Sequence, residues 1–397
     1  MDLIERVRRW AVARPCVLVV DVPGSTALRW TVEAELDRRG WPLALSPAGA
    51  DLLLVVGTPG EDLAQAVDVV WSQVPGPRHR ASISTGDEVS SALDAAVEAL
   101  GEAAGRGQPG DDERPSPGDL LEQRGGGDHM AMEHGGTDAD GHGEGVPHAD
   151  GHAMDHAGMD HGAMGHGGHG EMDHSGHGGM DVAGLPMAGT TPDRDGLRLD
   201  ALQVSLGPVL AGWPPGLLLH GQLQGDVLSR VRLTWVDADT GDERPASDSG
   251  DARLLALDHL SRSLEVAGWP TAARDARRAR DRLCAADPAD VEAGHRRAAR
   301  LARRVRRSRT LAWSLRGIGV VGDAEAGPFR GDVFDRVRWW CELASAPEPP
   351  ADVPPGLSLE RVAGALDGAE LAAARLVVAS LPLSHPAARR MPLSARV

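Results

Sequence analysis

Several residue types are scarce or missing in this chain of 397 residues, and each absence excludes a class of protein. The three cysteines, Cys16, Cys284 and Cys341, are too few and too far apart for a disulfide framework. No two of them have the CxxC spacing of a local zinc or iron–sulfur motif. Tyrosine is absent, so no phenol can serve in catalysis. Lysine is absent too, which excludes a phosphate-binding P-loop at the glycine-rich segment 57–60.

Long apolar runs and a basic charge balance are also lacking. The longest apolar runs, Val17–Val20 and Leu52–Val56, are far shorter than the roughly 20 residues of a membrane helix. The charged start, Met1–Arg6, is unlike a secretory signal. A net charge of -17 opposes binding to a phosphate backbone, so we expect no nucleic-acid partner. We therefore expect a cytoplasmic protein, free or peripheral at the inner face of the cell membrane, with no transmembrane segment.

Apolar runs alternate with helical patterns near the start of the chain. A continuous apolar run such as 51–57 is typical of a strand buried on both faces. The alternation predicts strands and helices at Cys16–Val22, Thr26–Arg39, Asp51–Gly57, Glu61–Val74, Ala81–Ser84 and Glu88–Ala104. Strands that alternate with helices indicate a parallel sheet, so residues 1–104 are predicted to form an α/β domain. Asp21 and Asp51, at strand ends, are interpreted as caps.

Residues 184–397 are predicted to form a second domain, α+β and mostly helical. Turn signals at Gly207-Pro208 and Trp213–Gly216 separate two strand regions, Leu197–Leu206 and Leu217–Trp235. Helical patterns follow at 251–267, 270–285, 288–309, 331–345 and 358–380. Pro270 and Pro288 stand near two of the helix starts, as the preference of proline for the first helical position predicts.

The segment 105–183 is dominated by Gly, Asp, His and Met, and has no apolar periodicity. Such a composition cannot bury enough apolar surface to offset the entropy of ordering, which predicts a disordered linker. Its histidines and methionines form an imperfect repeat of candidate metal ligands. They are His129, His134, His142, His148, His152, Met154, His156, Met159, His161, Met164, His166, His169, Met172, His174 and His177.

These ligand types suit transition metals but do not identify one. Thioethers favour Cu(I), whereas imidazoles suit Cu, Ni and Zn equally well. We therefore expect Cu, Ni or Zn ions to bind this segment. The alternative is a linker that grew by repeat slippage and has no metal-related role.

In the segment 41–58, Ser46-Pro47 precedes Ala50-Asp51, and the predicted strand that follows ends in Gly57-Thr58. This order and spacing resemble the small, B-type subunit of NADH-quinone oxidoreductase (complex I). The turn Gln73–Arg78 resembles that family's Gln-Met-Pro-x-Pro-Lys turn. The likeness covers about residues 14–90. It implies a relative of this quinone-site subunit and of the small subunit of membrane nickel–iron hydrogenases.

The second half resembles the large, D-type subunit of the same enzyme, which is related to the hydrogenase large subunit. Leu206–Leu210, Pro215–Leu217 and Leu223–Val227 are similar to its N-terminal β region. Gly331–Arg336, continuing to Glu342, is similar to its helix with the pattern Gly-Asp-Val-x-x-Arg…Glu. The resemblance implies a structural ion-pair role for Asp332, Arg336 and Glu342.

Both resemblances fail at the redox chemistry. In the relatives, cysteines after the first and later strands bind a [4Fe–4S] cluster, but here Gly24–Ala27 and Thr85–Asp87 occupy those loops. The family's histidine two residues after Gly-Pro falls on Leu210, and its quinone-site tyrosine has no counterpart. The hydrogenase cysteine pairs for nickel are missing as well. We therefore expect no iron–sulfur cluster and no catalytic residue.

Residues 296–309 hold eight arginines, and Ala298, Leu301, Ala302 and Val305 form an apolar stripe at helical spacing. The pattern predicts an amphipathic helix with a basic face. A solvated face is one interpretation. Docking onto an acidic partner or anionic lipid headgroups is another, and the candidate docking residues are Arg296, Arg300, Arg303 and Arg307.

Three functions follow as hypotheses. The first is a non-catalytic accessory or assembly protein of a complex I- or hydrogenase-type membrane-associated complex. The second is an intracellular buffer or metallochaperone for copper, nickel or zinc, in which the flanking domains are scaffolds. The third is an electron-transfer protein like those of NADH-quinone oxidoreductase, which would need cofactor ligands from another chain.

Deletion of residues 128–181 is expected to abolish binding of Cu²⁺ or Ni²⁺ and to leave the thermal unfolding transition unchanged. In the whole chain, binding should weaken as the pH falls below about 6.5, because protonated imidazole cannot ligate a metal. Isothermal titration at several pH values measures both effects. Undiminished stoichiometry in the deletion variant would contradict the prediction.

Overall fold

The computed structural model describes residues 14–106, 189–192, 198–238, 251–322, 324–351, 353–383 and 385. The predicted metal ligands from His129 to His177 lie outside these residues. The described residues on both sides of that segment belong to one compact unit, which spans residues 1–123 and 188–397.

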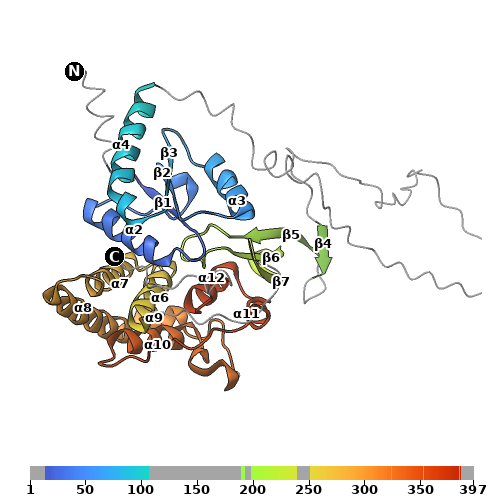
Figure 1. Cartoon of the computed structure of the whole chain (residues 1–397). Helices are drawn as coiled ribbons and strands as arrows, with labels where there is room; N and C mark the ends of the chain where they lie inside the picture. Colours follow the sequence, from blue (N-terminus) through green and yellow to red (C-terminus); the bar gives the residue numbers. More distant parts are fainter. Residues whose placement is uncertain are drawn as a thin grey trace, which may run out of the picture. The chain divides into compact units, whose positions relative to one another are not determined.

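The first part of the chain forms a small parallel sheet, as predicted. Strands β1 (Val17–Asp21), β2 (Leu52–Val56) and β3 (His79–Ile83) lie in the order β1-β2-β3, with Val17 opposite Leu52 and Leu52 opposite His79 (Figure 1). Every residue of the central strand β2 is buried, which explains its unbroken apolar sequence.

Helices cover both faces of this sheet. They are α2 (Thr26–Arg39), α3 (Glu61–Ser72) and α4 (Val89–Arg106). On one face Leu52, Leu54 and Val56 pack with residues of α2 and α4. On the other face Leu53 and Val55 pack with residues of α3. The alternation of side chains along β2 therefore supplies two separate hydrophobic clusters.

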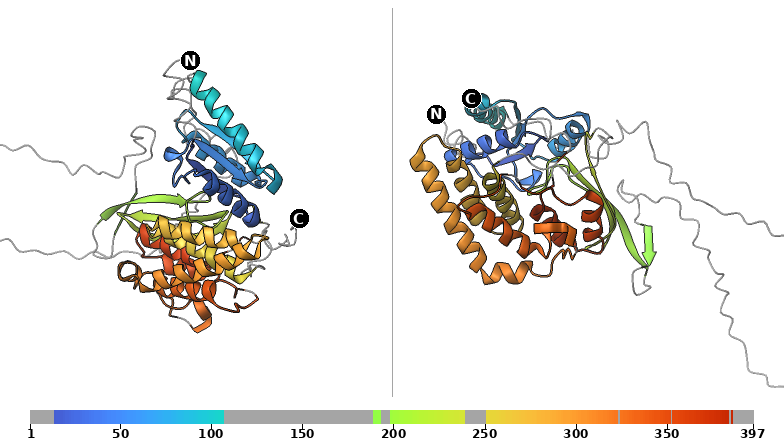
Figure 2. Two further views of the ribbon diagram at one scale, coloured as in Figure 1. Left: turned by 90° about the vertical axis from the view of Figure 1, so that its left-hand side faces the viewer. Right: turned by 60° about the horizontal axis from the view of Figure 1, so that its bottom comes forward.

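The later part of the chain is mostly helical, as predicted, and begins with an antiparallel sheet. Its strands are β4 (Gly189–Pro192), β5 (Arg198–Leu206), β6 (Leu217–Gln224) and β7 (Val227–Trp235), in that order. Figure 2 shows β5–β7 as a twisted ribbon beside the helices. The helices are α6 (Ala252–Val266), α7 (Pro270–Leu283), α8 (Pro288–Arg307), α9 (Arg309–Leu315), α10 (Val333–Ser345), α11 (Leu359–Leu366) and α12 (Leu371–Ser380).

Two helices predicted as continuous are interrupted. The one predicted over 288–309 ends at Arg307, and Ser308 caps the next helix by accepting a hydrogen bond from Leu311 N. The one predicted over 358–380 breaks between α11 and α12, where Gly368 has a φ of 82°. A left-handed residue cannot continue a right-handed helix, and glycine adopts it without strain. The short strand β4 was not predicted.

A single large cluster forms the core of the helical part. It joins α6, α7, α8, α10 and α12 to β6 and β7 through residues such as Leu257, Trp340 and Val377. Trp30 of α2 belongs to this cluster as well, although its neighbours Val32 and Leu36 pack against the parallel sheet. Helix α2 is therefore shared by both cores. Among the helices that the structure describes, none has the length and apolarity to cross a bilayer.

Asp237, just after β7, caps a helix that lies far away in the sequence. Its carboxylate accepts hydrogen bonds from Asp62 N (2.8 Å) and Leu63 N (3.1 Å), in the first turn of α3. The N-cap residue of α3, Gly60, has no side chain to serve this purpose. A Cβ atom at Gly60 would also clash with the Asp237 carboxylate. The cap thus ties the helical part to the α/β part.

Asp237→Ala is expected to destabilise the fold by about 1 kcal/mol, because two N–H groups of α3 lose their acceptor. Chemical denaturation followed by circular dichroism measures the change. Asp226→Ala, an exposed residue of the β6–β7 turn, is the matched control and should change stability by less than about 0.5 kcal/mol. Equal effects of the two substitutions would contradict the cap.

Candidate functional site

The most unusual feature of the described structure is a cluster of buried ion pairs between α2, α6 and α7. Two faces of helix α2 pack against other parts of the protein. Val32 and Leu36 pack on the sheet, whereas Arg29, Trp30 and Glu33 face the helices of the later part of the chain. The spacing of these residues places them on one side of a helix of 3.6 residues per turn.

Asp258 of α6 lies at the centre of the cluster, with its side chain 3% exposed. Its carboxylate accepts from Arg29 Nη2 at 2.7 and 2.8 Å and from Arg280 Nη1 at 2.8 Å. The indole Nε1 of Trp30 donates to it at 2.9 Å, and Arg262 Nη2 lies 3.0 Å away. One carboxylate thus receives three guanidiniums and an indole, drawn from three helices.

A second layer of contacts surrounds Asp258. Arg29 also donates to Asp21 (2.8 Å) and to Glu33 (2.6 Å). Arg280 of α7, which is fully buried, donates to Glu33 (2.8 Å) and to its neighbour Asp281 (2.9 Å). The guanidinium of Arg280 also lies 5.1 Å from the ring centre of Trp30. These contacts fix the buried arginines in both position and orientation.

The carboxylates of the cluster differ in their pKa values. Burial opposes ionisation of Asp258, but Arg29, Arg262 and Arg280 outweigh it and hold the pKa of Asp258 well below its usual value. The pKa of Glu33 is likewise lowered, since Arg29 and Arg280 offset its burial. Asp21 behaves oppositely: burial raises its pKa to about 6, against the opposing effects of Arg29 and Arg262.

The count of charges agrees with the raised pKa of Asp21, which is protonated below a pH of about 6. Three guanidiniums, those of Arg29, Arg262 and Arg280, face four carboxylates. Protonation of one carboxylate balances the cluster. Asp21 Oδ1 is buried and has no hydrogen-bond partner, so its side chain loses least by becoming neutral.

A pocket of about 130 Å³ opens beside the cluster. Its apolar wall comes from β1, from residues 43–45 and from the loop 208–215, which follows β5. Its polar wall consists of Asp21, Arg29, Glu33, Ser261, Arg262, Glu265 and Arg277. The volume is close to that of a cavity that holds one benzene-sized ring. The pocket could therefore admit a small ligand with an apolar body and a polar edge.

The backbone conformation of the loop 208–215, which lines this pocket, depends on Gly207. Gly207 has a φ of 95°, and a Cβ atom there would clash with the Leu217 carbonyl and approach Trp213 Nε1. The Trp213 indole donates to the same carbonyl at 2.8 Å. The glycine and the indole together hold Pro208–Leu210 against the pocket.

The residues predicted as structural ion pairs have a structural role of another kind. Asp332 caps α10 by accepting from Asp335 N (2.9 Å), and the Asp335 carboxylate accepts from Asp332 N in return. Arg336 is buried and donates to Ser380 Oγ (2.8 Å) and to the carbonyls of Gly331 (2.9 Å) and Gly319 (3.1 Å). Burial lowers the pKa of Arg336 to about 10, although Asp332 and Asp335 oppose the fall. Glu342 is exposed.

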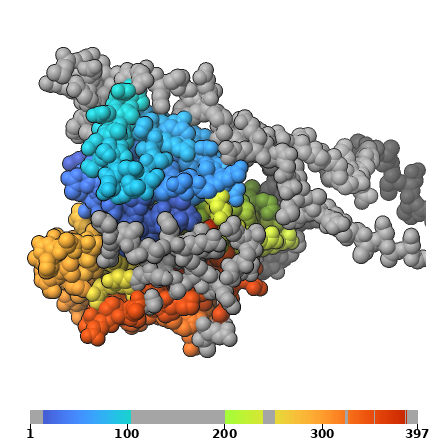
Figure 3. Space-filling model, viewed as in Figure 1, coloured from blue at the N-terminus to red at the C-terminus, as the bar shows by residue number. Residues whose placement is uncertain are grey.

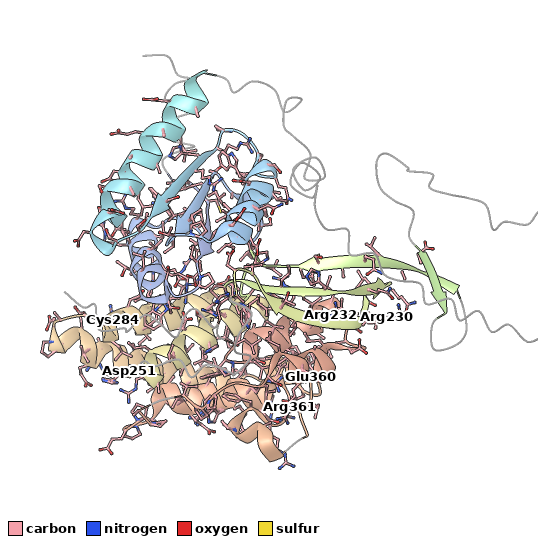
Figure 4. All side chains as sticks on the ribbon, turned by 45° about the vertical axis from the view of Figure 1, so that its right-hand side comes forward. Arg230, Arg232, Asp251, Cys284, Glu360 and Arg361 are labelled. Carbon is pink, nitrogen blue, oxygen red and sulfur yellow. The ribbon has the colours of Figure 1, made fainter. Side chains whose placement is uncertain are left out.

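The loops that resemble cluster-binding loops do not offer thiolates. In the first loop Ser25 N donates to Val22 O (3.0 Å), and the Ser25 hydroxyl packs against Gly57 at the end of β2. Cys16 precedes β1, Cys341 is buried in α10 with a pKa raised to about 12, and Cys284 lies at the end of α7 (Figure 4). Hydroxyls that stay protonated do not fit an iron–sulfur cluster, which is held by thiolates.

No group of three or more His, Cys, Asp or Glu side chains suited to a metal ion occurs in the described ranges. The predicted metal ligands fall in the segment outside those ranges. The basic helix is α8, as predicted, and Arg296, Arg300, Arg303 and Arg307 are all exposed on it. Asp51 acts as a cap, since its carboxylate accepts from Cys16 N (2.8 Å), but Asp21 was wrongly interpreted as one.

The ion-pair cluster was not predicted, although the sequence carries a signal for it. Asp258 interrupts the apolar run Leu254–Leu260, where a charge can be tolerated only with a buried partner. Its three arginine partners lie on α2, α6 and α7, and sequence spacing alone does not pair residues 229 positions apart.

Asp21→Asn is expected to stabilise the protein above pH 6 and to have little effect below pH 4. The folded protein holds the Asp21 proton up to a pH of about 6, whereas the unfolded chain releases it near 3.9. The protonated Asp21 therefore makes its full contribution to the free energy of unfolding below pH 4, and this contribution is lost as the pH rises through 6. The gain is at most about 3 kcal/mol, and asparagine keeps an acceptor for Arg29 Nε.

Asp258→Asn is the matched comparison and should behave oppositely. Its depressed pKa contributes stability above pH 4, so the substitution should cost about 3–5 kcal/mol at pH 7 by leaving buried guanidiniums unpaired. Urea unfolding at pH 4, 6 and 8 measures both variants. Destabilisation by both at pH 8 would refute the raised pKa of Asp21.

Comparisons of the chain with protein-family models, with curated proteins and with solved structures find no match.

Proposed function

We propose that this protein is a non-catalytic relative of the paired small and large quinone-site subunits of complex I and of the membrane hydrogenases. It serves as an accessory or assembly protein of such a membrane-associated complex and carries a metal-binding His/Met segment. The proposal combines the sequence resemblance with the pocket beside the ion-pair cluster.

One observation carries the proposal. Segments from both parts of the chain line one pocket: Leu18–Asp21 belongs to the strand before the loop 24–27, in the part that resembles the small subunit, and Pro208–Leu210 comes from the part that resembles the large one. None of the residues that line this pocket is a cysteine, histidine or tyrosine. Leu210 stands where the resemblance places a histidine.

The charged residues that line the pocket are bound to other side chains of the protein. Arg29 and Glu33, which line the pocket, are bound to Asp258 and Arg280 behind it. A guanidinium with a pKa held well above its usual value neither exchanges protons near neutral pH nor accepts electrons. These residues join the two parts into one unit, as a docking or assembly role requires.

A second function, the metal buffer or chaperone, is favoured by the His/Met repeat between His152 and His174. Imidazole and thioether ligands spaced by glycine bind several ions without a preformed site. The two functions are compatible in one chain, because the repeat and the pocket use different residues.

Deletion of the gene in its native host is expected to lower the amount of an assembled NADH-quinone oxidoreductase or hydrogenase, measured by in-gel activity of solubilised membranes. The variant lacking residues 128–181 should restore assembly, because it keeps both flanking parts. The Asp258→Asn variant should restore less, because the joint between the parts is weakened.

Other outcomes favour other functions. Metal tolerance that returns only with the whole chain, while complex activity is unaffected, would favour the buffer. Iron and acid-labile sulfide in the anaerobically purified whole chain, or reduction of a quinone by it, would overturn the non-catalytic proposal and favour an electron-transfer role.

A further inference from the structure

The basic helix α8 has two faces with different surroundings. Ala298, Leu301, Ala302 and Val305, the stripe predicted from the sequence, are buried in the helical core. The opposite face is exposed to solvent. Because the apolar stripe is already used inside the protein, α8 cannot bind a membrane by inserting that stripe, as an isolated amphipathic helix does.

The seven arginines of α8 have different surroundings: Arg296 donates to Glu292 of the same helix (3.0 Å), and Arg306 is exposed. Arg297 and Arg304 donate to Asp275 of α7 at 3.0 and 3.1 Å and hold the two helices together. Arg300, Arg303 and Arg307 are exposed, and no carboxylate in the described part of the chain pairs with them. Their spacing of three and four residues puts them on one side of the helix.

The cationic surface continues into α9, where it gains exposed apolar side chains. Trp313 is 85% exposed, and Val320, five residues beyond α9, is 63% exposed. Arg309 is also exposed and precedes Trp313 by one turn, so the two share a face of α9. Residues 293–322 contain nine arginines and no acidic residue, in a chain whose net charge is -17.

We infer that this surface, defined by Arg300, Arg303, Arg307, Arg309, Trp313 and Val320, docks on an anionic lipid bilayer. Guanidinium groups bind the phosphates of lipid headgroups, and exposed arginines near an anionic membrane are attracted to its surface. Tryptophan favours the boundary between headgroups and acyl chains. In Figure 3 the gold and orange atoms of the α7–α8 region lie at the lower left edge of the molecule.

A bilayer suits these residues better than a nucleic acid does. A nucleic acid would bind the arginines and could stack on Trp313, but it offers no apolar environment for Val320. The interior of a bilayer accepts both apolar side chains. The inference rests on α8, α9 and Val320 and does not depend on the function of the pocket.

The whole chain is expected to sediment with vesicles of phosphatidylcholine and phosphatidylglycerol but not with vesicles of phosphatidylcholine alone. The variant Arg300→Gln/Arg307→Gln should bind the anionic vesicles at least about tenfold more weakly, because it removes two phosphate contacts. Binding should also weaken as salt is raised. The matched control is Arg230→Gln/Arg232→Gln, two exposed arginines of β7, which should bind like the unchanged protein (Figure 4).

Trp313→Phe tests the aromatic contact separately. Brominated acyl chains should quench part of the fluorescence of the unchanged protein and less of the fluorescence of this variant. Equal quenching of the two proteins would contradict insertion of Trp313.

Three results would overturn the inference. The first is equal binding to neutral and anionic vesicles, and the second is equal loss in the two double variants. The third is binding that appears only after deletion of residues 128–181, since this acidic segment rather than the bilayer would then occupy the surface. Salt-sensitive binding to RNA in place of vesicles would likewise assign the surface to a nucleic acid.

Discussion

The association of the two described parts of the chain depends on the carboxylate of Asp258. It is the shared acceptor for Arg29 of α2, Arg262 of α6 and Arg280 of α7, so its loss leaves two buried guanidiniums and one half-buried guanidinium short of a partner. A buried ion pair adds little net stability compared with apolar residues of the same volume, but it is demanding in its geometry. The cluster therefore specifies how α2 docks, while Trp30 and the surrounding apolar residues supply the burial.

The sequence predicted the elements of the fold better than their partners. Local signals set the helices: α2 begins and ends where the pattern predicted, and Pro270 and Pro288 stand at the first positions of α7 and α8. The periodicity of apolar residues does not identify the partner of a helix face that carries charged residues. The amphipathic pattern of α2 is weak because one side packs on a sheet and the other packs on ion pairs. Asp237, which caps α3 across 174 positions of sequence, was beyond the reach of sequence analysis for the same reason.

The candidate site brings together segments that are far apart in the chain. Pro208–Leu210 and the end of β1 meet at the pocket, and sequence spacing does not show such a meeting. Arg336 was predicted to have a structural ion-pair role. It is buried, but its hydrogen bonds go to Ser380 and to backbone carbonyls, which no charge pattern in the sequence indicates.

Because α2 belongs to two hydrophobic cores, neither part of the protein can lose this helix and keep its own interior intact. The surface between the parts thus resembles the contact between two separate chains more than a flexible hinge. Cleavage of the chain between Arg106 and Gly189 would leave two fragments that still present complementary surfaces. The covalent connection then acts mainly by raising the local concentration of one fragment around the other. In this respect the two parts are complementary in the way that the two subunits of a heterodimer are, although one polypeptide contains both.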